Sequence, residues 1–103
     1  MEEVEREILE ICGVSSEVID DAKRIRSLEE NVYRSWLTLT REGNAIRVHL
    51  SFSEPVKTQE EFEKYLKRNN IKDYKIGVTR SETEDYFITL NSGMEIEFYN
   101  PNK

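Results

Sequence analysis

The chain has few of the residues on which enzymes and metalloproteins most often depend. It contains one histidine, His49, and one cysteine, Cys12, so it forms no internal disulfide and has no CxxC motif or His/Cys cluster to hold zinc. A GxxxxGK[ST] phosphate loop, a GxGxxG dinucleotide loop and an HExxH motif are also absent from the sequence. These absences predict a non-catalytic protein with no metal site and no small-molecule cofactor.

Long apolar runs are missing as well. No stretch approaches the roughly 18 apolar residues that cross a bilayer, and the start, MEEVEREILEIC, is acidic and amphipathic, unlike a signal peptide. The formal net charge is −6, with the acidic excess in residues 1–31 and 81–103 and a mildly basic middle. Overall acidity disfavours non-specific binding to DNA or to anionic membranes. We therefore expect a cytoplasmic protein with no membrane partner.

Glycine and proline are scarce too, with four and two residues, and no linker, repeat or low-complexity tract divides the 103 residues. The charged fraction is high, at 35%, and the apolar fraction is 37%, but the apolar residues recur with regular periods. This periodicity is typical of a folded chain. It predicts one domain over residues 1–103 with a modest core.

Apolar residues at helical spacing predict two helices, at about 2–12 and 16–30, with one kinked helix as the alternative. Gly13 suits the left-handed residue that closes a helix, and Ser15 or Ser16 can cap the second one. The stripes expected to be buried are Val4, Ile8, Ile11 and Cys12 in the first helix, and Val18, Ala22, Ile25 and Leu28 in the second.

Alternating residues then predict two strands, at about 32–40 and 45–53, joined by a two-residue turn at Glu42 and Gly43. This turn fixes the register, and a slip of one residue would reverse every side chain. The expected core-side pairs are Leu39 with Ile46, Leu37 with Val48 and Tyr33 with Phe52; the outward pairs are Trp36 with His49, Thr38 with Arg47 and Arg34 with Ser51.

Residues 59–69 are predicted to form a helix, because Thr58 and Glu61 have the spacing of a capping box and Asn69-Asn70 suits its end. Its buried residues are Phe62, Tyr65 and Leu66. Three alternating segments follow and predict a meander of strands, in which Asn91-Ser92-Gly93 is a tight loop. The expected inward residues are Tyr74, Ile76 and Val78, then Tyr86, Ile88 and Leu90, which face Phe98, Ile96 and Met94.

The predicted fold class is therefore α+β, in the order ααββαβββ, with a five-stranded, mainly antiparallel sheet and helices packed on one face. The order of the strands stays open at this point, because the middle helix separates the hairpin from the meander.

The outward face of this sheet is the best candidate for function. It combines large aromatic residues with charges, and exposed aromatic residues of this kind are informative. An N-terminal helix could cover it as a second core, a protein could bind it, or single-stranded nucleic acid could stack on it. We interpret His49 as a solvated histidine stacked on Trp36, with a ligand-contacting or pH-sensing role as the alternative. The face comprises Trp36, Phe87 and Tyr99 with Arg34, Arg47, His49 and Lys75, and with Glu95 and Glu97 toward the last strand.

Two weaker candidates have structural explanations. Glu82, Glu84 and Asp85 lie in one polar loop that could bind a hard cation weakly but lacks the EF-hand pattern. A basic strip near the end of the middle helix could dock an acidic segment, although cations there also complement the helix dipole. The strip contains Lys64, Lys67, Arg68, Lys72 and Lys75.

The sequence thus predicts a small module that binds a protein partner or a second copy of itself, as a regulator, inhibitor or accessory subunit. Binding of single-stranded nucleic acid, helped by Lys72 and Lys75, is the alternative. The expected binding residues are Trp36, Arg47, His49, Arg34, Phe87 and Tyr99.

Overall fold

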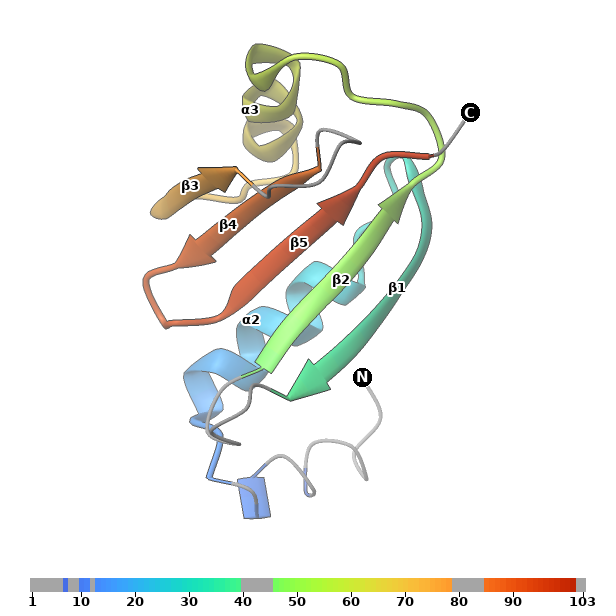
Figure 1. Cartoon of the computed structure of the whole chain (residues 1–103). Helices are drawn as coiled ribbons and strands as arrows, with labels where there is room; N and C mark the ends of the chain where they lie inside the picture. Colours follow the sequence, from blue (N-terminus) through green and yellow to red (C-terminus); the bar gives the residue numbers. More distant parts are fainter. Residues whose placement is uncertain (1–6, 8–9, 12, 40–45, 79–84, 102–103) are drawn as a thin grey trace.

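The structure is a computed structural model that describes residues 7, 10–11, 13–39, 46–78 and 85–101. The five strands form one sheet in the order β1-β2-β5-β4-β3, with α2 and α3 on one of its sides (Figure 1). The α+β class and the mostly antiparallel five-stranded sheet are confirmed, whereas the helix predicted at 2–12 falls largely outside the described residues. The elements are α2 (Ser16–Arg26), β1 (Val32–Leu39), β2 (Ile46–Phe52), α3 (Gln59–Arg68), β3 (Tyr74–Val78), β4 (Tyr86–Leu90) and β5 (Glu95–Tyr99).

Strand β5 lies beside β2 and runs parallel to it, while the other three neighbouring pairs are antiparallel. This placement answers the question that the sequence left open. The hairpin β1-β2 is joined to the meander β3-β4-β5 by the pairing of β2 with β5. One row of paired positions therefore crosses the whole sheet and consists of Trp36, His49, Glu97, Phe87 and Gly77.

The predicted register of the hairpin is confirmed for the five pairs that run from Arg34/Ser51 to Leu39/Ile46. The sixth pair is wrong: Val32, not Tyr33, lies opposite Phe52, because the register shifts between Val32 and Arg34. An extra residue in one strand is a β-bulge, which turns side chains away from the regular alternation. As a result Tyr33 is 74% exposed instead of buried in the core.

Helix α2 is shorter than predicted and ends at Arg26, where the backbone N–H of Ser27 donates to carbonyl oxygens of the last turn. Ser15 is the N-cap, and its hydroxyl accepts from the backbone N–H of Val18. The predicted residues Val18, Ala22 and Ile25 are buried, together with Ile19, and Leu28 packs partly buried against the core.

Ile11 is 85% exposed, which corrects the expectation that it lies on a buried stripe. Gly13 has a φ of +86°, the left-handed conformation that the sequence predicts there. Because this turn breaks the line of the helix, Ile11 does not continue the buried face of α2. The other members of that stripe lie outside the described residues.

Helix α3 begins as the capping box predicts, since the hydroxyl of Thr58 accepts from the backbone N–H of Glu61 at 3.1 Å. The Glu61 carboxylate reaches back to the backbone N–H of Lys57, one residue before the expected Thr58. Asn70, with a φ of 58°, follows the last turn. The helix therefore lies where its sequence signals indicate.

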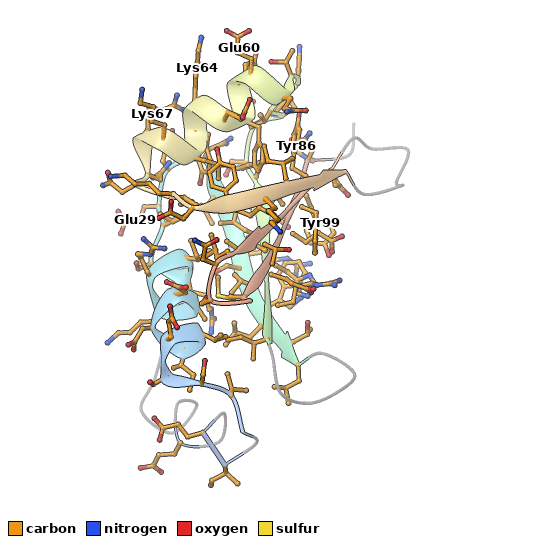
Figure 2. All side chains as sticks on the ribbon, turned by 90° about the vertical axis from the view of Figure 1, so that its left-hand side faces the viewer. Glu29, Glu60, Lys64, Lys67, Tyr86 and Tyr99 are labelled. Atoms are coloured by element: carbon orange, nitrogen blue, oxygen red, sulfur yellow. The ribbon has the colours of Figure 1, made fainter. Side chains whose placement is uncertain are left out.

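The core is a single layer between the helices and the sheet, and aromatic rings fill its α3 end. Phe62 stacks on Tyr86 with ring centroids 4.2 Å apart, and Phe98 packs edge-on against Phe62 and Tyr65. Figure 2 shows Tyr86 beneath α3 and Tyr99 on the opposite side of the sheet. In the part of the chain that the structure describes, no helix is long and apolar enough to cross a bilayer.

Candidate functional site

The side of the sheet that faces away from α2 and α3 is called the outer face below. All six residues that the sequence analysis selected for binding lie on it, at paired positions of β1, β2, β5 and β4. Neither described helix packs on this side (Figures 1 and 2). The proposal that an N-terminal helix covers it concerns residues outside the described ranges. The members of the outer face are Arg34, Trp36, Thr38, Arg47, His49, Ser51, Lys75, Gly77, Phe87, Thr89, Glu95, Glu97 and Tyr99.

Three rings on the outer face lie parallel to one another and form an aromatic cluster. The centroids of Trp36 and His49 are 5.1 Å apart with an interplanar angle of 5°, and Tyr99 lies 5.7 Å from Trp36 and 5.8 Å from His49. Offset parallel stacking is a favourable arrangement for such rings. The cross-strand pairing of Trp36 with His49 and the parallel pairing of β2 with β5 bring the three rings together.

His49 is also the centre of a chain of hydrogen bonds. Its Nε2 lies 2.8 Å from the Thr38 hydroxyl and its Nδ1 lies 2.7 Å from the Tyr99 hydroxyl, which in turn donates to the carboxylate of Glu97. Since the proton of Tyr99 points to Glu97, the Tyr99 oxygen accepts from Nδ1–H. Neutral His49 therefore carries its proton on Nδ1, and Nε2 accepts from Thr38.

The surroundings of this chain of hydrogen bonds shift two pKa values. Burial lowers the pKa of His49 below its ordinary 6.5; the nearby Glu97 carboxylate opposes this change and Arg47 adds to it. Burial also raises the pKa of Tyr99 well above its usual range, and its hydrogen bond to Glu97 acts in the same direction. Both shifts favour the uncharged forms of His49 and Tyr99.

His49 is only 9% exposed, which corrects the expectation of a solvated histidine, although its predicted stacking on Trp36 is confirmed. The reason is its position on β2, since β1 and β5 lie on either side and supply Trp36 and Tyr99 to flank the ring. Neither of the two cavities described below is lined by His49.

Two arginines lie over aromatic rings but differ in their partners. The guanidinium carbon of Arg47 is 5.1 Å from the ring centre of Phe87, and its nitrogens donate to Glu95 at 2.7 and 2.9 Å. The guanidinium carbon of Arg34 is 4.8 Å from the ring centre of Trp36. Among the described residues Arg34 has no carboxylate partner. It is therefore the uncompensated cation of the aromatic cluster.

Phe87 covers Gly77 on the neighbouring strand. A Cβ at position 77 would lie 3.2 Å from Cδ1 of Phe87, so any residue other than glycine there would displace the Phe87 ring by a few tenths of an ångström. The arrangement extends the aromatic surface of the outer face to β3. Lys75, on the same strand, is exposed.

Beside the aromatic cluster, at the end of the sheet where β5 finishes, is a cavity of about 630 Å³, called the end cavity below. The walls of this cavity come from β1, β2 and the end of β5, and the parallel pairing of β2 with β5 brings them together. Because the sequence does not predict this pairing, it does not predict the cavity either. A second cavity of about 510 Å³ lies near the end of α3 and is mostly polar. The end cavity is lined by Tyr33, Arg34, Ser51, Phe52, Ser53, Asp85, Tyr99, Asn100 and Pro101.

Asp85 is the one described member of the acidic loop that the sequence analysis considered for a cation. It is 7% exposed, and its Oδ1 accepts from the backbone N–H of Asn100 at 2.9 Å. Glu82 and Glu84 lie outside the described residues. Within the described ranges, no three His, Cys, Asp or Glu side chains gather as a metal site.

The basic strip near α3 is partly neutralised by acidic residues. Arg68 donates to the Glu30 carboxylate at 2.6 and 3.0 Å, and Lys64 lies 3.4 Å from Glu60 on the outer side of the helix (Figure 2). These pairs weaken the case for an acidic partner there.

Comparison of the chain with models of protein families, with curated proteins and with solved structures finds no match to any of them.

Proposed function

We propose that this protein is a small non-catalytic module that binds a second copy of itself through the outer face and the adjoining edge of β1. The observation that carries this proposal is the aromatic cluster, which reaches the edge strand at Trp36. Tryptophan, tyrosine and arginine are the residues most enriched at the centres of protein interfaces. The acidic composition and the single cysteine support a cytoplasmic location.

The charges of the outer face favour protein over nucleic acid. Glu95 and Glu97 lie on the central strand β5, where they would repel phosphates. Arg47 already donates to Glu95, which leaves fewer cations for a phosphate backbone. Mixed charges of this kind suit a protein surface, in which a cation of one copy meets an acid of the other.

The edge strand supports a second copy as the partner. Strand β1 lies at the edge of the sheet, and its unpaired backbone groups can add another strand. Tyr33 and Leu39 at its ends are 74% and 46% exposed. Two β1 strands that pair antiparallel bury Leu39 and continue the aromatic surface from one copy to the other, which favours a symmetric dimer.

The molar mass in solution tests this proposal. We expect light scattering to give twice the chain mass of 12.2 kDa and the variant Trp36→Ala to shift the equilibrium toward monomer, with circular dichroism unchanged. Lys64→Ala is the control, because Lys64 is exposed on α3, away from both the outer face and β1. Leu39→Lys tests the edge separately if Trp36→Ala unfolds.

A monomer at every concentration would overturn the proposal. A dimer that survives both Trp36→Ala and Leu39→Lys would place the interface elsewhere and overturn it too. Quenching of Trp36 fluorescence by an oligonucleotide, with affinity that falls as salt rises, would favour the nucleic-acid function instead.

A further inference from the structure

We propose that the end cavity binds a small aromatic anion, meaning a planar ring that carries one phosphate or carboxylate group. This inference does not depend on the dimer. The cavity of about 630 Å³ has the volume of ordinary small-molecule sites. Its walls combine a cation, hydroxyl groups and aromatic rings, which are the groups that such a ligand needs.

The bulge in β1 brings two consecutive residues to the cavity. In a regular strand, neighbouring residues point to opposite faces of the sheet. Here the register shift at Tyr33 allows both Tyr33 and Arg34 to line the same cavity. Bulges of this kind are frequent next to binding sites because they re-aim side chains. Tyr33 is 74% exposed and available to stack on the ring of a ligand.

Arg34 is the group that would bind the anion. Its guanidinium is held over the Trp36 ring, 4.8 Å from the ring centre, which orients it without using its N–H donors. In the described part of the chain no carboxylate pairs with Arg34. A planar guanidinium that is already oriented binds phosphate or carboxylate with two parallel hydrogen bonds.

Two hydroxyl groups at the end of β2 add further donors. Ser51 lies across from Arg34 in the sheet, and Ser53 follows two residues later. Both line the cavity, and neither hydroxyl forms a hydrogen bond with another residue that the structure describes. Hydroxyl groups without protein partners can turn toward a bound anion.

A wall of the cavity formed by Asn100 is fixed by hydrogen bonds. The side chain of Asn100 is bonded to both backbone groups of Val56, and its backbone N–H donates to the buried carboxylate of Asp85. Arg34 is the cationic residue of the lining, so the anionic group lies at the Arg34 end of the cavity and the ring lies between Tyr33 and Tyr99.

Nuclear magnetic resonance of the full, ¹⁵N-labelled chain tests the inference, with adenosine monophosphate and benzoate as the two probes. We expect at least one probe to shift the amide signals of Ser51, Ser53 and Asn100 and the side-chain Nε–H of Arg34. Binding of adenosine monophosphate alone identifies phosphate as the anionic group, and binding of benzoate alone identifies carboxylate. Adenosine and inorganic phosphate, each with half of the required chemistry, should bind at least about tenfold more weakly.

Arg34→Gln should weaken binding by about tenfold or more, because it removes a charge-assisted pair of hydrogen bonds. Arg47→Gln is the matched control: it removes a cation from the same face, at a residue that does not line the cavity. No shifts at up to about 10 mM of either probe would overturn the inference. Equal weakening by the two variants would overturn it as well, since the effect would then be one of overall charge. Light scattering on the same samples reports the dimer separately.

Discussion

His49 and Tyr99 are joined by a hydrogen bond of 2.7 Å, although 50 residues separate them in the chain. The bond forms because β2 and β5 run parallel side by side, which brings the two rings within reach across the sheet. It links the single histidine to the Glu97 carboxylate through the hydroxyl of Tyr99.

The first prediction concerns acid. The pKa of His49 is lowered from 6.5 in the folded state, mainly by burial, so the unfolded chain binds a proton at a higher pH than the folded one. In the window between the folded pKa and 6.5 the unfolded state holds more protons, and the free energy of unfolding therefore falls as the pH falls. Below the folded pKa this loss is complete.

A proton-resonance titration of the His49 ring measures its pKa, and urea unfolding at about pH 5 and about pH 7.5 measures the free energy. In His49→Gln this part of the pH dependence should disappear. A measured pKa at or above the ordinary value would contradict the prediction.

The second prediction removes the hydroxyl between His49 and Glu97. In Tyr99→Phe the Nδ1–H of His49 and the Glu97 carboxylate lose their shared partner, and both side chains are largely buried, at 11% and 17% exposure. We expect unfolding to become easier by about 1–3 kcal/mol, the cost of leaving a buried polar group unpaired. Tyr33→Phe is the control, because the Tyr33 hydroxyl has no hydrogen bond within the described residues and its loss should change little. Equal effects of the two variants in urea unfolding would contradict this account.

That Trp36 and His49 both point to the outer face could be predicted from the sequence. The alternating apolar residues of the two strands allow only one register; these are Leu37, Leu39, Ile46 and Val48. Local capping signals likewise defined the start of α3. Both depend on residues that are close in sequence, where elementary periodicity and turn chemistry decide the result.

The chain of hydrogen bonds and the end cavity could not be predicted, since both need β5 beside β2. No local pattern specifies that pairing, which joins segments almost fifty residues apart. The bulge at Tyr33 was missed for a different reason. Val32 and Tyr33 are consecutive apolar residues, so the alternation does not say which of them faces Phe52.

The third prediction concerns alkali and Tyr65. Its hydroxyl donates to the backbone carbonyl of Glu30 at 2.8 Å, and burial raises the pKa of Tyr65 from 10.0 to about 12. The folded state thus keeps its proton while the unfolded chain loses it. The contribution to stability is therefore fully present below pH 10.0 and is lost as the pH rises toward about 12.

Tyrosinate absorbance, compared between the natural chain and Tyr65→Phe, isolates this group. The variant should also show a weaker loss of stability in alkali. Titration of Tyr65 near its ordinary pKa would contradict the prediction.

The fourth prediction concerns the tie between the end of β5 and the segment before α3. Asn100 accepts from the backbone N–H of Val56 at 2.8 Å and donates to its carbonyl oxygen at 2.9 Å, where Val56 is 7% exposed. Asn100→Ala removes both bonds and leaves the N–H of Val56 buried without its partner. We expect a loss of about 1–3 kcal/mol in the free energy of unfolding.

Asn91→Ala is the matched control, because Asn91 is exposed and its side chain forms no hydrogen bond to the residues that the structure describes. Exposed substitutions of this kind usually change stability by less than about 0.5 kcal/mol. Hydrogen exchange gives a second readout, since the Asn100 amide that donates to Asp85 should exchange faster in Asn100→Ala. If Asn100→Ala cost no more than the control and left that amide protected, the tie to Val56 would not hold the end of β5. The Asn100 wall of the end cavity would then be held in place by other contacts.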